Sequence, residues 1–342
     1  VHCFTPAKKP TNHKCQLRKR LAINKKMETG VRCLPFAAHS GKTHCSPDVR
    51  NFPGLPLRVV PFSAGVSTTR TTSRIVMSSS THDARKPAGQ QHKIIIPNKY
   101  GEKLVGLLRE VGSKEIIILC HGFRATKESI PISNLAAALE NEGFSSFCFD
   151  FAGNGESEGL FQYGNYRREA DDLHAVTEHF HGANRAIHAI LGHSKGGNVV
   201  LLYASMYHDM DMVINVSGRY DLKGGIEERL GKENLRRIEE DGSADIKNKK
   251  GEVDYRVTKE SLLDRINTDM RDVHLIGKQC RVLTIHGSAD ETIPVGDALE
   301  FAKIIPNHKL HIIEGADHCY TSHQDELVSV VIDFLRTGMQ CG

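Results

Sequence analysis

The sequence of 342 residues has no tryptophan and no long apolar run, and its nine cysteines include no CxxC pair. Cysteines without such close spacing indicate neither a zinc cluster nor a redox pair, so no metal and no cofactor is predicted. Cys120, Cys148 and Cys280 lie in apolar runs, where a free thiol packs as a small hydrophobic group. A reducing compartment is the simpler inference. Because no apolar run reaches about eighteen residues, no transmembrane segment is predicted.

Acidic residues are scarce in the first part of the chain. Residues 1–82 contain 14 Lys and Arg but only 2 Asp and Glu, whereas the remainder contains 31 basic and 39 acidic residues. The main part of the chain therefore has no basic stripe of the kind that binds nucleic acid, and no nucleic-acid partner is predicted. An acid-poor segment rich in Ser, Thr and Arg is typical of an organelle transit peptide.

We therefore expect residues 1–91 to be a disordered or transit-peptide-like extension. Translation that starts at Met27 would give a transit peptide and a plastid (chloroplast) location, whereas a start at Met77 would give a cytoplasmic protein. A secretory signal is not expected, because the extension has no continuous apolar core.

Residues 92–338 alternate between strand-like and helix-like segments. A hairpin is predicted from Lys93 to Arg109, around the turn Asn98-Lys-Tyr-Gly. Buried strands are predicted at 115–120, 144–149, 186–191, 213–216, 281–285 and 310–313, and helices at 130–142, 166–180, 198–207, 295–304 and 326–335. This alternation predicts an α/β domain with a mostly parallel central sheet and helices on both faces.

Residues 221–278 interrupt the alternation with 27 charged residues in 58. A solvated insertion over one end of the sheet fits this composition better than another core layer. Ile226, Leu230, Leu235 and Ile238 have near-helical spacing and predict an amphipathic helix. We interpret the insertion as a lid over a site; a mere spacer is the alternative.

The segment Gly192-His-Ser-Lys-Gly-Gly197 matches the pattern G-x-S-x-G between a predicted strand and a predicted helix. Small neighbours permit the sharp turn that raises a serine above the carboxyl edge of a sheet. The helix that follows directs the positive end of its dipole toward that serine. In this context Ser194 is predicted to be a nucleophile.

A nucleophilic serine needs a base, and the base needs an acid that orients it. Asp290 follows the predicted strand 281–285, and His318 follows the strand 310–313, so both lie at the same sheet edge as Ser194. We therefore predict Ser194, Asp290 and His318 as a catalytic triad. Asp221 is the alternative acid, and Asp317 is expected to bond to backbone. The remaining nearby histidines are expected to be packing or surface residues: His193, His286 and His323.

Two backbone N–H groups are expected to stabilise the negative oxygen formed during the reaction. Lys195, directly after the nucleophile, and Phe123, after the strand 115–120, are the predicted donors of this oxyanion hole. His121 is expected to bond to the loop backbone rather than to act in catalysis. The glycine-rich turn 150–157 lacks the Lys-Ser/Thr of a P-loop, so it is predicted to be structural.

Together these motifs resemble the α/β-hydrolase superfamily over residues 92–338. The motifs that carry the resemblance are His121-Gly122, Asp150 with Gly153-x-Gly155-x-Ser157, Gly192–Gly197, Asp290 and His318. Within the superfamily the chain is similar to serine aminopeptidase S33-like, monoacylglycerol lipase-like and feruloyl (cinnamoyl) esterase-like proteins. The resemblance implies the α/β-hydrolase fold with an inserted cap after the sixth strand. At Lys195 these relatives often carry Met or Gln, and we expect the cationic side chain to be able to alter the acyl pocket.

The leading hypothesis is a carboxylic ester hydrolase of the serine esterase or lipase type, which forms an acyl-enzyme with a small-molecule acyl ester. An amide or peptide hydrolase of the aminopeptidase type is the first alternative. A small-molecule receptor on a hydrolase scaffold is the second. Ester cleavage ranks first because an alkoxide leaving group demands less of the general acid than an amine does. No oligomeric state is predicted.

Overall fold

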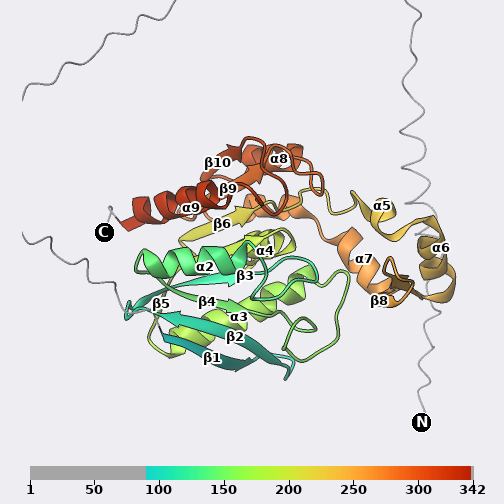
Figure 1. The fold of residues 1–342 in the computed structure, drawn as a ribbon, viewed down its shortest axis with the longest axis horizontal. Coiled ribbons are helices and arrows are strands. Elements are labelled where there is room, and N and C mark those ends of the chain that lie inside the picture. Colours follow the sequence, from blue (N-terminus) through green and yellow to red (C-terminus); the bar gives the residue numbers. More distant parts are fainter. Residues whose placement is uncertain (1–89, 340–342) are drawn as a thin grey trace, which may run out of the picture. The chain divides into compact units, whose positions relative to one another are not determined.

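A computed structural model of the protein describes residues 90–339 (Figure 1). The predicted extension, residues 1–91, lies outside the described residues except for its last two, Gln90 and Gln91, which belong to the first strand. The transit-peptide function of this segment therefore stays a prediction.

The described residues form an eight-stranded sheet in the order β1-β2-β4-β3-β5-β6-β9-β10. The first three strands in this order pair antiparallel, and all the others pair parallel. The strands are β1 (Gln90–Pro97), β2 (Lys103–Glu110), β3 (Glu115–Cys120), β4 (Ser145–Phe149), β5 (Ala186–His193), β6 (Met212–Val216), β9 (Arg281–Gly287) and β10 (His308–Ile313). The predicted α/β architecture with a mostly parallel sheet is confirmed.

Helices cover both faces of this sheet (Figure 1). Alternate residues of β3 divide between the two faces, because successive side chains of a strand point to opposite sides. Ile116 and Ile118 join the core beneath α3, α4 and α8, whereas Ile117 and Leu119 join the core beneath α2 and α9. The helices are α2 (Ile132–Asn141), α3 (Tyr166–Gly182), α4 (Lys195–Tyr207), α8 (Gly296–Ile304) and α9 (Gln324–Met339).

The predicted helix bounds lie within two residues of the observed ones except at α4 and α9. Helix α9 ends at Met339, four residues beyond the predicted end at 335. The sequence predicts a helix from residue 198, but α4 begins at Lys195, directly after Ser194. The glycines at 196 and 197 concealed its first turn, because glycine is a poor helix former. Of the helices between residues 90 and 339, none combines the length and the hydropathy needed to cross a bilayer.

A cap is inserted in the chain between β6 and β9, which agrees with the predicted insertion after the sixth strand (Figure 1). It contains α5 (Ile226–Leu230), α6 (Lys232–Asp241), the antiparallel hairpin of β7 (Ser243–Lys247) and β8 (Val253–Thr258), and α7 (Lys259–Asn267). We use the name cap for residues 226–267. Its apolar side chains form a cluster of their own, which includes Ile226, Leu230, Ile238 and Val257.

Two local features of the cap differ from prediction. The single predicted amphipathic helix is split in two at Gly231, whose φ of 76° favours glycine and interrupts the helical hydrogen bonds. The charged insertion, for which no strand was predicted, also contains the hairpin of β7 and β8, closed by a turn in which the side chain of Asn248 accepts from the N–H of Lys250. Few of its residues are apolar, so the period of two that identifies a strand was weak.

The end of the predicted insertion belongs to the main core. A 3₁₀ helix, η1 (Met270–Leu275), follows the cap, and Met270, Val273 and Ile276 are buried against the same face of the sheet as α4. The part that projects from the main core is thus shorter than the predicted segment 221–278.

Candidate active site

Ser194 occupies a strained turn between β5 and α4. Its φ of 56° and ψ of −119° lie in a region that side-chain-bearing residues rarely adopt. A Cβ on Gly192 would stand 2.1 Å from the carbonyl oxygen of Gly196, so only glycine allows the chain to turn this tightly. The Ser194 N–H donates to the carbonyl oxygen of Val216 on β6 at 2.8 Å, which ties the turn to the neighbouring strand.

The structure brings the three predicted triad residues together. The Nε2 atom of His318 lies 3.0 Å from the Oγ of Ser194, and its Nδ1 atom lies 2.7 Å from the Oδ2 of Asp290. The Asp290 side chain is fully buried, whereas that of His318 keeps 16% of its surface exposed. A buried carboxylate on Nδ1 fixes the imidazole so that Nε2 faces the serine oxygen.

Asp290 is held as a carboxylate by its surroundings. Its Oδ1 accepts the N–H groups of Thr292 and Ile293, each at 2.8 Å, and the Nε2 of His286 lies 3.3 Å from its Oδ2. Burial alone would raise the pKa of Asp290, but the hydrogen bonds from His286, His318 and the backbone outweigh it and hold that pKa well below its usual range. His286 packs as predicted, but its contact with the acid was not foreseen.

The alternative acids lie elsewhere. Asp221 is exposed, and its carboxylate accepts the N–H of Lys223 at 3.0 Å. Asp317 accepts the N–H of Thr321 at 2.8 Å, which agrees with the predicted backbone role. Of the candidate acids, it is Asp290 that contacts His318 through its carboxylate.

His193 packs beside the base rather than replacing it. Its Nε2 lies 2.8 Å from the carbonyl oxygen of His318, and the two ring centres are 4.9 Å apart. Burial, together with the neighbouring His318, lowers the pKa of His193 to about 4. His193 therefore stays neutral near pH 7 and supports the loop that carries His318, in agreement with its predicted packing role.

The loop after β3 lies against the nucleophile. A Cβ on Gly122 would stand 3.1 Å from the Cβ of Ser194, so glycine permits this close approach. Lys195 begins α4, and the first N–H groups of a helix have no partner within it. Within residues 90–339, neither the Lys195 N–H nor the Phe123 N–H donates to another group. Their function as oxyanion donors stays a prediction.

His121 supports this loop from beneath, as predicted. Its Nδ1 lies 2.8 Å from the carbonyl oxygen of Gly122, and its Nε2 accepts the N–H of Phe151 at 3.1 Å. These two bonds require the tautomer with its proton on Nδ1. Burial lowers the pKa of His121 to about 4, so the ring stays neutral.

The turn after β4 is structural, as predicted. Asp150 fills it: its carboxylate accepts the backbone N–H groups of Lys127 and Glu156 and forms a buried ion pair with the Lys127 ammonium group at 2.8 Å. A Cβ on Gly155 would stand 2.3 Å from Oδ2 of Asp150. The glycine therefore makes room for the carboxylate of this same turn rather than for a bound phosphate.

The side chain of Lys195 points into the protein and not toward an acyl group. Its ammonium nitrogen lies 2.6 Å from Oε1 of Glu169 on α3 and 5.0 Å from the centre of the Tyr166 ring. Only 5% and 8% of the Lys195 and Glu169 side chains are exposed. We expected this cation to be able to alter the acyl pocket. The structure instead pairs it with the buried carboxyl group of Glu169.

Phe123 connects the loop after β3 with the cap. Its ring centre lies 5.6 Å from that of Tyr163 and 5.7 Å from that of Tyr255 on β8. The same side chain packs against the cap's apolar cluster. Beside it, Arg124 pairs with Asp254 of the cap. The cap thus packs on the loop beside Ser194, which is the position that the lid interpretation requires; whether it acts as a lid stays a prediction.

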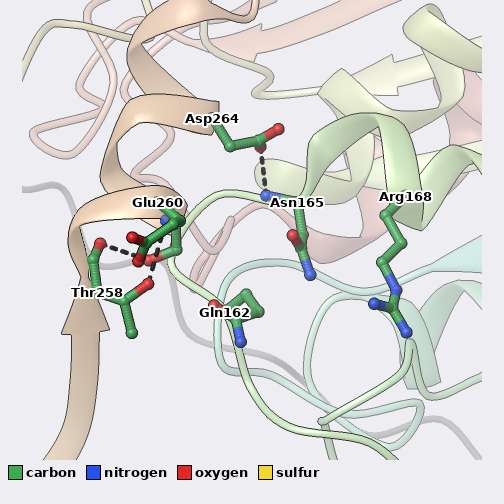
Figure 2. Close-up of a pocket in the computed structure, with 7 residues that line it drawn as sticks. Gln162, Asn165, Arg168, Thr258, Glu260 and Asp264 are labelled. Atoms are coloured by element: carbon green, nitrogen blue, oxygen red, sulfur yellow. Dashed lines mark hydrogen bonds between the residues drawn. The ribbon is translucent and has the colours of Figure 1, made fainter. Parts of the chain in front are cut away.

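A pocket of about 510 Å³ lies between the start of α3 and the cap helix α7. Figure 2 shows the side chains that line it. Its wall is polar and includes Asn165, Arg168, Thr258 and Asp264. The carboxylate of Asp264 accepts the backbone N–H of Asn165 at 2.5 Å, so it fastens the cap to the residue that precedes α3. No triad residue lines this cavity, which is therefore separate from the candidate active site.

Comparison with known proteins gives three kinds of match. Residues 112–238 match the family model described as serine aminopeptidase, S33. The uncharacterised protein YDL057W of Saccharomyces cerevisiae is 24% identical over 226 residues, which is 60% of this chain and 69% of the yeast protein.

Three solved structures resemble the described fold. Est1E from Butyrivibrio proteoclasticus, with ferulic acid bound, is 23% identical with a TM-score of 0.60, over 72% of this chain and 99% of its own. The α/β hydrolase GrgF from Penicillium is 19% identical with a TM-score of 0.62, over 72% and 98%. The esterase Pf2001 from Pyrococcus furiosus is 18% identical with a TM-score of 0.56, over 73% and 91%. Each neighbour is covered over almost its full length.

Proposed function

We propose that the chain is a serine hydrolase of the α/β-hydrolase type that cleaves carboxylic esters through an acyl-enzyme. The match of residues 112–238 to the serine aminopeptidase, S33, model and the fold shared with the structural neighbours support this proposal. One observation carries the proposal: a strained serine, a largely buried histidine and a fully buried carboxylate form a continuous chain of hydrogen bonds. This chain provides a nucleophile, a base and the group that orients the base.

In the proposed acylation step, the Oγ of Ser194 attacks the ester carbonyl carbon while Nε2 of His318 accepts the serine proton. The imidazolium that results is stabilised by Asp290, which stays ionised because its pKa is held low. The tetrahedral intermediate then collapses, its C–O bond to the alcohol breaks, and His318 returns the proton to the departing alkoxide. The products of this step are an alcohol and a serine acyl ester.

The negative oxygen of the intermediate is proposed to bind the N–H groups of Lys195 and Phe123. Two features support this assignment: the absence of other acceptors for these N–H groups among residues 90–339, and the contact between Gly122 and Ser194. The positive end of the α4 helix dipole further stabilises the negative charge on this oxygen. In the second step, water attacks the acyl carbon, His318 accepts the proton of water and returns it to Ser194, and the carboxylic acid leaves.

Esters are proposed as substrates ahead of amides. Two structural neighbours, Est1E and Pf2001, support this choice, since one holds ferulic acid and the other is an esterase. The match to the serine aminopeptidase model favours amide or peptide bonds as the second candidate. Amide cleavage needs more complete protonation of the leaving nitrogen by His318, and the two candidates therefore differ in which leaving groups are accepted.

A fluorophosphonate probe tests the proposal, because it reacts covalently with an activated serine. We expect labelling of the protein at Ser194, loss of labelling in Ser194→Ala, and unchanged labelling in Ser133→Ala, a control serine on α2. The same protein is then given nitrophenyl esters of graded chain length and aminoacyl nitroanilides. Turnover of the anilides alone would favour the peptidase candidate. Absence of labelling and of turnover would refute the hydrolase and favour a small-molecule receptor.

A further inference from the structure

Three arginines lie in the cap or in the segment that leads into it; we call Arg219, Arg229 and Arg265 the arginine cluster. The guanidinium carbon of Arg229, on α5, lies 4.7 Å from the centre of the Phe123 ring. That of Arg265, on α7, lies 5.1 Å from the centre of the Tyr163 ring. Because the two rings are 5.6 Å apart, both cations flank one aromatic pair beside the candidate active site.

Arg219 connects the cluster to the catalytic loops. Its backbone N–H donates to Oδ1 of Asn198 at 3.0 Å, one turn along α4 from Ser194. Its guanidinium group donates to the carbonyl oxygen of Thr292, two residues after Asp290. Arg219 therefore contacts both the helix that follows the nucleophile and the loop that carries the acid.

The three guanidinium groups have no carboxylate partner. Within residues 90–339, none of them has a carboxylate oxygen within 4.0 Å. Other arginines of the cap are paired: Arg236 and Arg237 contact Glu233, and Arg256 contacts Asp245. Of the three unpaired arginines, Arg229 is exposed, Arg219 is partly buried and Arg265 is buried. The missing carboxylate is therefore most unusual at Arg265, because a buried charge is normally paired.

Arg265 is that buried side chain, with 6% of its surface exposed. It donates to the carbonyl oxygen of Leu222 at 2.9 Å and to the hydroxyl of Tyr166 at 2.7 Å, and both acceptors are neutral. Burial lowers the pKa of Arg219, and the positive charges of Arg265 and Arg229 lower it further. The negative charge of Asp297 acts in the opposite direction. The cluster thus holds repelling like charges with only partial compensation.

The hydroxyl of Tyr163 lies in the same surroundings. It is buried and has no hydrogen-bond partner among the described residues, although buried hydroxyl groups are almost always paired. Burial raises the pKa of Tyr163, and Arg265, Arg229 and Arg219 each act in the opposite direction, which places all three cations within electrostatic reach of this hydroxyl. A bound oxyanion would accept from the hydroxyl and neutralise the cations together.

We propose that the arginine cluster is a subsite for an anionic oxygen group of the substrate, so that the preferred esters carry a carboxylate or a phosphate besides the bond that is cleaved. A half-ester of a dicarboxylic acid is the simplest such molecule. This inference rests on the proposed function for the ester bond. The binding of the anion rests on the cluster alone.

Hydrolysis of mono-4-nitrophenyl glutarate is compared with that of its methyl ester, which is neutral and otherwise matched. We expect a higher kcat/KM for the charged ester. This preference falls about tenfold in Arg229→Gln and in Arg219→Gln, since each removes a charge-assisted hydrogen bond. It is unchanged in Arg237→Gln, a paired and exposed arginine of the same cap. Competition by glutarate and by inorganic phosphate, measured separately, identifies which oxyanion the subsite accepts.

A binding measurement separates the two proposals. Glutarate and inorganic phosphate are titrated calorimetrically into Ser194→Ala, with and without Arg219→Gln or Arg229→Gln, after thermal unfolding has shown which variants are folded. If either anion binds in an arginine-dependent way but the wild type hydrolyses neither ester, the proposed hydrolase function is refuted and the proposed anion subsite is supported. Equal turnover of both esters, together with no arginine-dependent binding of either anion, would overturn the subsite.

Discussion

The buried pair of Lys195 and Glu169 makes the free energy of unfolding depend on pH. The substitution Glu169→Gln should remove this part of the pH dependence. Burial raises the pKa of Glu169 from 4.5 to about 7, although the Lys195 ammonium group opposes this shift. A pKa raised by folding means that the folded protein binds the proton more tightly than the unfolded chain does. The stability from this group is therefore complete below about pH 4.5 and is lost as the pH rises through 7.

The size of the effect follows from the shift. Each pKa unit corresponds to about 1.4 kcal/mol, so this carboxyl group contributes about 3 kcal/mol to the free energy of unfolding at low pH, and most of it is lost between pH 5 and pH 8. Other groups also make stability depend on pH in this range, among them His193, whose pKa is lowered from 6.5 to about 4 by folding, so the informative quantity is the difference between wild type and Glu169→Gln. We expect this difference to decrease by about 2 to 3 kcal/mol from pH 5 to pH 8.

Urea unfolding at both pH values, analysed by linear extrapolation, measures this difference. Glu233→Gln, which changes an exposed glutamate on α6, is the matched control and should show no comparable change. A difference between wild type and Glu169→Gln that is the same at pH 5 and pH 8 would refute the reasoning, because Glu169 would then not bind a proton on folding.

Three further predictions concern the triad, the cap and the first residues of the chain. Asp290→Asn should lower kcat about 10⁴-fold because His318 loses its orienting carboxylate, whereas Asp221→Asn should leave kcat within a factor of about two. Steady-state kinetics compare the two variants, and a greater loss of kcat in Asp221→Asn would contradict the assignment. Replacing residues 226–267 by a short Gly/Ser linker should change the chain-length preference of ester hydrolysis, as measured on graded esters, and a folded variant with unchanged preference would refute the lid. A fluorescent fusion of residues 27–81 should enter plastids because the segment is poor in acid and rich in Ser, Thr and Arg; a wholly cytosolic signal would oppose this.

Much of the core was predictable because its signals are local. The strand β3 is a continuous apolar run, and the sequence around Ser194 has a pattern that only a tight strand-to-helix turn explains. Asp290 and His318 could be placed beside Ser194 because the carboxyl ends of parallel strands share one edge of a sheet. Chain order and strand ends thus sufficed for the three residues that the structure brings together.

The parts that escaped prediction depend on contacts between distant residues. The partner of Lys195 is 26 positions away on another helix, and no local pattern connects it with Glu169. The high charge of the insertion indicated a solvated surface, but it concealed Arg265, which is buried against Tyr163 and Tyr166. Only the folded chain distinguishes an arginine that faces solvent from one that is buried beside aromatic rings.

The position of Phe123 has a consequence for protein engineering. Its backbone belongs to the loop beside Ser194, while its ring is part of the wall on which the cap packs. A cap transplanted from a related enzyme would meet this ring and that of Tyr163, neither of which travels with it. Chimeras that exchange residues 226–267 alone should therefore unfold more readily than chimeras that also exchange positions 123 and 163. In the design of chimeras, the cap and these two core positions should therefore be exchanged together.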